Sequence, residues 1–185
     1  MIYLLGGAPR CGKSILARTI NREDGLAVVS TDLLRGVLAP LLPALKAAMD
    51  SRDFKREADI FFPHLRQAAL VLNLQLPNAV IEGVGFFPRH VAALREHLPT
   101  GVQACFLGRS SATDDALFGH ATDHRLYERL SDEGRGRLAE LILAWSAAIE
   151  RECAEAALPY IDLALAGFNA GLAQAHERLF EGPAR

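Results

Sequence analysis

Residues 7–14, Gly-Ala-Pro-Arg-Cys-Gly-Lys-Ser, have the residue types and the spacing of a phosphate-binding loop. Gly7 and Gly12 let the backbone turn with positive φ and approach phosphate oxygens without a Cβ in the way. Successive N–H groups of such a loop form an anion-binding concavity, to which the N-terminus of the following helix adds partial positive charge. The octapeptide therefore predicts binding of a nucleoside triphosphate with magnesium.

Lys13 and Ser14 carry the charge chemistry of this loop. Lys13 is expected to act as a catalytic point charge on the β- and γ-phosphates, and the Ser14 hydroxyl is expected to bind magnesium. The chain contains 3 lysines and 17 arginines, so a lysine at the one position where the motif requires it supports the assignment. The predicted nucleotide-binding residues are Gly7, Ala8, Pro9, Arg10, Cys11, Gly12, Lys13, Ser14, Ile15 and Arg109.

Asp32 and Arg35 form a second candidate cluster, just after the apolar run 26–30. An aspartate past the carboxyl end of a strand that neighbours the phosphate loop is well placed to accept a proton from a substrate hydroxyl. Arg35, one helical turn later, is expected to hold an anionic group of the substrate in a fork. The alternative is that Thr31 or Asp32 only caps the next helix, and an aspartate can do both.

Glu82 follows the apolar residues Val80 and Ile81. In proteins with such a phosphate loop, a carboxylate at the end of a buried strand organises magnesium, and aspartate is the usual residue there. We therefore predict Ser14 and Glu82 as metal ligands, and Glu82 and Gly83 as substrate contacts. The alternative is that Glu82 activates the attacking group or a water molecule.

The polar segment 109–136 has the character of a lid. Arginines that close over the γ-phosphate neutralise developing charge in phosphoryl transfer. The candidates in and beside this segment are Arg109, Arg125, Arg129, Arg135 and Arg137. Arg125 and Arg129, one turn apart on an expected helix, are the predicted catalytic pair. The alternative is a solvated face, because acidic residues are interspersed among these arginines.

The composition limits the class of protein. The chain has 185 residues, half of them hydrophobic, and a net charge of −2, which favours one well-buried domain over residues 1–185 and gives no reason to expect nucleic-acid or membrane binding. Three widely spaced cysteines do not form a disulfide framework. Because an apolar segment of strand type begins at residue 2, a signal peptide is not expected. These features favour a soluble cytoplasmic protein, a monomer or a homodimer, whose partner is a small molecule.

Apolar runs of strand type alternate with helical patterns along the whole chain. Strands are expected at residues 2–5, 26–30, 78–82, 102–107 and 160–165, and helices at 13–23, from 32 onward, and at 54–75, 89–98, 136–156 and 168–180. Pro63 is expected to kink or restart its helix, and residues 40–53 read as an irregular or separately packed segment. This alternation predicts a doubly wound α/β sheet, with its ligand at the carboxyl ends of the strands.

With these residues in hand, the chain resembles small P-loop kinases of the adenylate-kinase-like group, which includes shikimate and gluconate kinases. The resemblance is specific in residues 7–14 and extends to residues 32–35. The region 105–162 also resembles bacterial ATP-binding proteins described as 2-phosphoglycerate-kinase-like. It implies a five-stranded parallel sheet in the order 2-3-1-4-5, a mobile lid, and ATP with Mg²⁺. The chain departs from the group at Glu82 and at residues 166–169, which do not supply the usual adenine clamp.

The leading hypothesis is an ATP-dependent phosphotransferase that acts on a hydroxyl of a small polar metabolite. In it the loop and Lys13 hold the triphosphate, Asp32 positions or deprotonates the acceptor, and Arg35 orients it. One alternative is a nucleotide-binding regulatory protein or slow NTPase whose output is a conformational change. Another is a nucleoside monophosphate kinase, in which Arg35 would bind the acceptor's phosphate and Asp32 would not be needed as a base.

Overall fold

The computed structural model describes residues 1–98, 101–113, 117 and 130–181 of the chain. Its centre is a five-stranded sheet in the order β2-β3-β1-β4-β5, and each pair of neighbouring strands is parallel. The strands are β1 (Ile2–Gly7), β2 (Ala27–Ser30), β3 (Ala79–Gly83), β4 (Val102–Gly108) and β5 (Tyr160–Asp162). The predicted fold class and strand order are confirmed.

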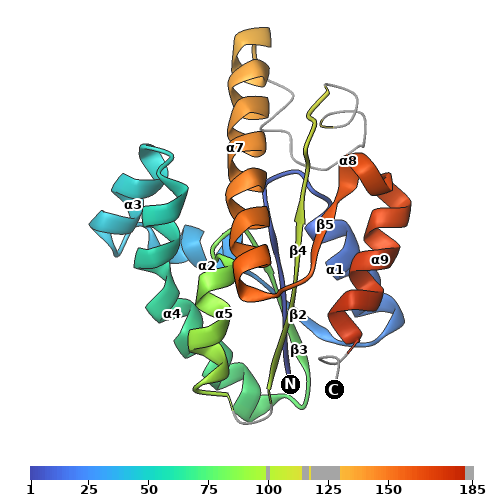
Figure 1. The fold of residues 1–185 in the computed structure, drawn as a ribbon. Helices are drawn as coiled ribbons and strands as arrows, with labels where there is room; N and C mark the ends of the chain where they lie inside the picture. The colour runs from blue at the N-terminus through green and yellow to red at the C-terminus, as the bar shows by residue number, and fades with distance from the viewer. Residues whose placement is uncertain (99–100, 114–116, 118–129, 182–185) are drawn as a thin grey trace.

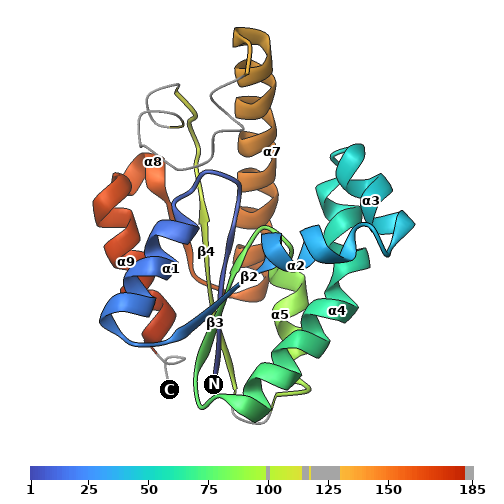
Figure 2. The ribbon, with the colours of Figure 1, turned by 180° about the vertical axis from the view of Figure 1, so that it is seen from behind.

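Helices cover both faces of the sheet (Figures 1 and 2). One face carries α1 (Lys13–Glu23), the short α8 (Leu163–Ala166) and α9 (Phe168–Phe180), and the other carries α4 (Phe54–Gln75), α5 (Pro88–Arg95) and α7 (Asp132–Ala156). The central strands are buried nearly throughout, which explains why their sequences are continuous apolar runs rather than alternating ones. No helix within the described ranges combines the length and apolar character needed to cross a bilayer.

The strand register brings three loops to one edge of the sheet. Leu5 of β1 and Ser30 of β2 both pair with Glu82 of β3, from opposite sides. Because the strands are parallel and end at nearly the same level, the chain leaves each of them at the same edge. The phosphate loop, α2 (Thr31–Leu38) and the segment after β3 therefore begin side by side.

Two helical expectations are corrected. Residues 40–53 contain a regular helix, α3 (Pro43–Asp50), which begins with proline in its first turn, where the missing N–H costs nothing. Pro63 does not restart its helix, because α4 runs unbroken from Phe54 to Gln75. Pro63 is solvent-exposed, so water can bond the carbonyl group that its missing N–H leaves free.

Side-chain caps move two other boundaries. The strand expected at 160–165 ends at Asp162, whose Oδ1 accepts a hydrogen bond from Ala164 N at 2.8 Å and starts α8. The helix expected from residue 136 begins at Asp132, because Ser131 Oγ accepts a bond from Gly134 N at 3.2 Å. The end of the expected lid segment is therefore the first turn of α7.

His90 joins α5 to α4. Its Nδ1 accepts a hydrogen bond from Phe87 N at 3.1 Å, so Nε2 carries the proton and donates to Asp59 Oδ1 at 3.0 Å. The Phe62 ring stacks on the imidazole with centroids 4.5 Å apart. Burial lowers the pKa of His90 below its ordinary value of 6.5, against the opposing hydrogen bond to Asp59.

We expect this lowered pKa to make stability depend on pH below about 6.5. In that range the unfolded chain binds a proton at His90 more readily than the folded chain, so the free energy of unfolding falls as the pH falls, by up to about 1.4 kcal/mol per pH unit. Urea unfolding between pH 7 and pH 5 measures this slope. The slope should be smaller in His90→Gln and unchanged in His97→Gln, which alters an exposed histidine; equal slopes in all three proteins would contradict the assignment.

Candidate active site

The loop between β1 and α1 has the backbone that a phosphate-binding loop requires. Gly7 has a φ of 141°, and a Cβ there would lie 2.1 Å from the carbonyl oxygen of Leu107. Gly12 has a φ of 72° directly before α1, and Arg10 also lies in the left-handed region at 58°. The two glycines of the motif are thus at positions where a side chain would clash or strain the backbone.

Lys13 is buried at the start of α1, with 6% of its surface exposed. Its Nζ donates a hydrogen bond to the carbonyl oxygen of Ala8, at 2.6 Å, within the loop itself. Burial lowers the pKa of Lys13, while the carboxylates of Asp32 and Glu82 act in the opposite direction. The positive charge therefore interacts with the carboxylate of Asp32 in the first turn of α2 and with that of Glu82 in β3.

Ser14 and Glu82, the two predicted metal ligands, lie together. Ser14 Oγ donates a hydrogen bond to Glu82 Oε2 at 3.3 Å. Within the described ranges, no group of three or more His, Cys, Asp or Glu side chains could hold a metal. One hydroxyl and one carboxylate nevertheless fit magnesium, because this ion is usually bound by one or two carboxylates while substrate phosphates and water complete its octahedron.

The helix-cap alternative for Asp32 is wrong. The N-cap of α2 is Ser30, whose Oγ accepts a hydrogen bond from Asp32 N at 3.2 Å. Thr31 is fully buried and accepts a bond from Gly85 N at 3.2 Å. The Asp32 side chain is therefore not needed to cap the helix, and it is 61% exposed. It lines a cavity, as its predicted role requires.

Arg35 has partners that the sequence did not indicate. Its Nε lies 2.8 Å from Glu57 Oε1 of α4, and its Nη1 lies 3.4 Å from Asp32 Oδ1. The Arg35 and Glu57 side chains are only 12% and 8% exposed. Burial raises the pKa of Glu57, and the neighbouring Arg35 opposes that rise. The guanidinium predicted to hold a substrate anion is thus already paired with two carboxylates of the protein.

Gly83 has a structural reason to be glycine. Its φ is 140°, and a Cβ would lie 1.9 Å from Thr31 Oγ1. The segment after β3 therefore packs directly against the start of α2, which holds Glu82 near Asp32. The role of Gly83 as a substrate contact stays a prediction.

A cavity of about 550 Å³ joins these groups at the carboxyl edge of the sheet. It is lined by loop residues 9–15 and by Asp32, Arg35 and Glu82, so most of the predicted site is brought together. The lining residues that the sequence analysis did not predict include Met49, Arg52, Phe54, Glu57, Val84, Leu138, Leu141 and Trp145. They come from α3, the connection between α3 and α4, α4, the loop after β3, and α7, and only their tertiary placement identifies them.

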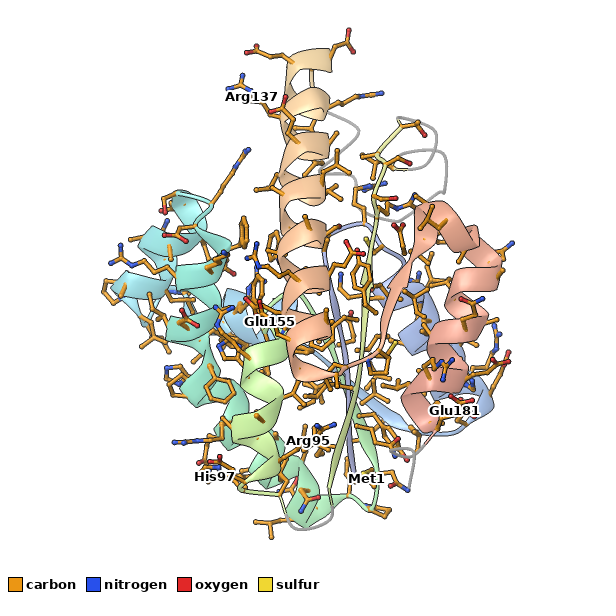
Figure 3. All side chains as sticks on the ribbon, in the orientation of Figure 1. Met1, Arg95, His97, Arg137, Glu155 and Glu181 are labelled. Atoms are coloured by element: carbon orange, nitrogen blue, oxygen red, sulfur yellow. The ribbon has the colours of Figure 1, made fainter. Side chains whose placement is uncertain are left out.

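The predicted lid arginines have different outcomes. Arg125 and Arg129 lie outside the described residues. Arg137 lies near the end of α7 that projects beyond the sheet (Figure 3), where it pairs with Glu133 at 2.8 Å in solvent. Arg137 is therefore a solvent-exposed, paired charge, which agrees with the alternative interpretation of this segment as a solvated face.

Arg109 is buried at the end of β4, with 4% of its surface exposed. Its guanidinium lies 5.9 Å from the centre of the Phe168 ring. That ring in turn packs beside the phosphate loop, because a Cβ on Gly12 would meet it at 3.0 Å. A contact between Arg109 and the nucleotide stays a prediction.

No protein-family model matches the chain, and no curated protein matches its sequence. Solved structures do match in fold. A gluconokinase from Sinorhizobium meliloti 1021 aligns with 98% of this chain and 97% of its own, with a TM-score of 0.50 and 18% identity. A sugar kinase from Janibacter sp. HTCC2649 aligns with 96% and 93%, with a TM-score of 0.54 and 18% identity. The chain therefore shares its fold with kinases.

The ion pair between Arg35 and Glu57 is expected to contribute to the free energy of unfolding. In Arg35→Met a buried carboxylate loses its main cation, so the free energy of unfolding at pH 7 should fall by about 3 kcal/mol. Combining this change with Glu57→Met should restore most of the loss, because both buried charges are then gone. Urea unfolding of the two variants measures both effects.

The exposed pair of Lys46 and Asp50 on α3 provides the matched control. Lys46→Met should cost less than about 0.5 kcal/mol, since exposed pairs at this spacing contribute little. If Arg35→Met cost no more than this control, or if the double variant lost the sum of two single losses, the buried pair would not have the assigned role.

Proposed function

We propose that the protein is an ATP-dependent phosphotransferase that moves the γ-phosphoryl group to a hydroxyl of a small molecule. One observation carries the proposal. A single cavity is lined on one side by the phosphate loop with Lys13 and Ser14, and on the other by Asp32 and the pair of Arg35 and Glu57. A donor and an acceptor bound in that cavity would meet beside a carboxylate that can take up a proton.

In the proposed reaction, the oxygen of the acceptor hydroxyl attacks the γ-phosphorus. The bond from that phosphorus to the bridging oxygen breaks, ADP leaves, and the hydroxyl proton passes to the Asp32 carboxylate. The loop N–H groups and Lys13 hold the β- and γ-phosphates and stabilise the charge that develops on them. Most of the rate enhancement would come from positioning two reactants in one enclosed site.

Ser14 and Glu82 would hold the magnesium ion. When bound there, the ion would neutralise negative charge on the phosphate oxygens. Lys13 adds a fixed positive charge from within the same loop.

The solved structures support the proposal at a coarser level. The matched proteins are named as a gluconokinase and a sugar kinase, and each aligns over nearly the whole of both chains. They support transfer of a phosphoryl group to a small molecule, whereas the use of ATP and the roles of single residues are our proposal. The pairing of Arg35 with Glu57 and Asp32 favours a hydroxyl acceptor over a nucleoside monophosphate at this arginine, since its guanidinium already has two carboxylate partners.

Asp32→Asn is expected to lower the acceptor-dependent kcat by about 10² to 10⁴, because the base is lost. The affinity for ATP should stay the same. ADP release with a panel of hydroxylated metabolites, nucleosides and nucleoside monophosphates measures the rate. Asp50→Asn, which alters an exposed carboxylate on α3, is the control and should behave as the wild type.

Two outcomes of this assay would count against the proposal. ATP hydrolysis that no acceptor stimulates, and that Asp32→Asn leaves intact, would indicate a slow NTPase. Turnover restricted to AMP, CMP or GMP would indicate a nucleoside monophosphate kinase.

Glu82→Gln is expected to raise the Mg²⁺ concentration for half-maximal nucleotide binding by about tenfold, because one of the two protein ligands loses its charge. Titration of a fluorescent ATP analogue at several Mg²⁺ concentrations measures this without turnover. Glu140→Gln, which changes an exposed residue of α7, should leave the Mg²⁺ dependence unaltered. Equal Mg²⁺ dependence in Glu82→Gln and the wild type would remove Glu82 from the metal site.

A further inference from the structure

The part of the cavity away from the phosphate loop has apolar walls. Met49 of α3, Phe54 of α4, Val84 after β3, and Leu141 and Trp145 of α7 all line it. A polyhydroxylated or acidic acceptor could not hydrogen bond to these side chains. An apolar body would instead displace water from them and gain the free energy of burial.

Phe54 and Trp145 form one aromatic wall. Their rings are stacked with centroids 4.6 Å apart and 14° between the planes. The Phe87 ring is nearly parallel to both, with its centroid 5.9 Å from that of Phe54 and 6.3 Å from that of Trp145. Phe87 is fully buried, so the wall is held from behind by the core. This backing fixes the orientation of the rings before any ligand binds.

Trp145 has an unused hydrogen-bond donor. Only 6% of the residue is exposed, and its indole Nε1 has no hydrogen-bond partner among the described residues. A buried donor without a partner costs free energy, on the order of 1–3 kcal/mol. Because Nε1 itself is buried, Trp145 offers the cavity apolar ring surface rather than a donor.

Ion pairs compensate the charge of Arg35 in this part of the cavity. The carboxylates of Asp32 and Glu57 both lie beside its guanidinium group, and all three side chains line the cavity. Arg35 lies between the two carboxylates, and Arg52 is exposed. An anionic acceptor at Arg35 would meet the two carboxylates that already pair with it, whereas an uncharged acceptor would disturb neither ion pair.

We propose that the phosphoryl acceptor is an uncharged alcohol with an aromatic body, bound with its ring against Phe54 and Trp145 and its hydroxyl at Asp32. A nucleoside or an aryl diol has this chemistry, whereas an aldonic acid, a free sugar or a sugar phosphate does not. This inference rests on the proposed phosphotransferase function and narrows its substrate.

The experiment compares matched acceptors in the presence of ATP and Mg²⁺. Uridine is paired with ribose, which lacks the base, and phenylethanediol is paired with ethylene glycol, which lacks the ring. Gluconate and 3-phenyllactate both carry a carboxylate. Gluconate has no ring, whereas 3-phenyllactate has an aromatic ring. Release of ADP and the mass of the phosphorylated product are both measured. At least one of the two aromatic alcohols should have a kcat/KM at least tenfold above that of its partner without a ring, and above those of the two acids.

The chain's single tryptophan is Trp145, so intrinsic fluorescence reports on the wall directly. The preferred aromatic alcohol should change this fluorescence in a saturable manner without ATP. Trp145→Phe and Phe54→Leu should each raise the KM for that alcohol about tenfold while the KM for ATP stays unchanged. Leu74→Ala, which alters an exposed residue of α4, should change neither value.

The outcomes separate the two proposals. Phosphorylation of gluconate or ribose in preference to the aromatic alcohols would overturn this inference and leave the phosphotransferase intact. Unchanged KM values for the preferred acceptor in both Phe54→Leu and Trp145→Phe would also overturn it. If Trp145→Phe does not fold, the conservative Phe54→Leu still allows the KM to be compared with that of the wild type. ATP hydrolysis without any phosphorylated product would overturn the phosphotransferase itself, and this inference with it.

Discussion

The hydrogen-bonded register of β1, β3 and β2 determines which side chains can meet at the carboxyl edge of the sheet. Because Leu5 and Ser30 flank Glu82 at one level, the phosphate loop and α2 begin within reach of the same carboxylate. A shift by one residue would turn Glu82 to the opposite face of the sheet. The contact of Ser14 with Glu82 and the position of Asp32 both depend on this alignment.

Local patterns in the sequence were sufficient for the parts of the site that lie next to strands. The phosphate loop needs only a strand, two glycines and a helix start in succession, and all of these lie within the first 23 residues. Strand and helix alternation likewise determines the doubly wound topology. Asp32 and Glu82 could be predicted for the same reason, since each follows a short apolar run whose end can be recognised.

The part of the cavity away from the phosphate loop could not be predicted in this way. Glu57 lies in the first turns of α4, and nothing around it in the sequence indicates that Arg35 is its partner. Trp145 belongs to an apolar stripe that is typical of a core helix, and it is indeed buried, yet it also lines the cavity. Such residues act through tertiary placement of α3, α4 and α7, which helical periodicity does not encode. Helix boundaries shifted for a smaller reason, because Ser131 and Asp162 cap helices that apolar patterns alone place differently.

The close packing of Gly83 against Thr31 has a mechanical consequence. Thr31 Oγ1 also accepts the hydrogen bond from Gly85 N, so the turn after β3 is bound to the first turn of α2. Glu82 and Asp32 are each adjacent to a residue of that contact, so their relative position depends on it. The two predicted carboxylates are therefore coupled at the edge of the sheet, whereas Phe54 and Trp145 reach the cavity from α4 and α7.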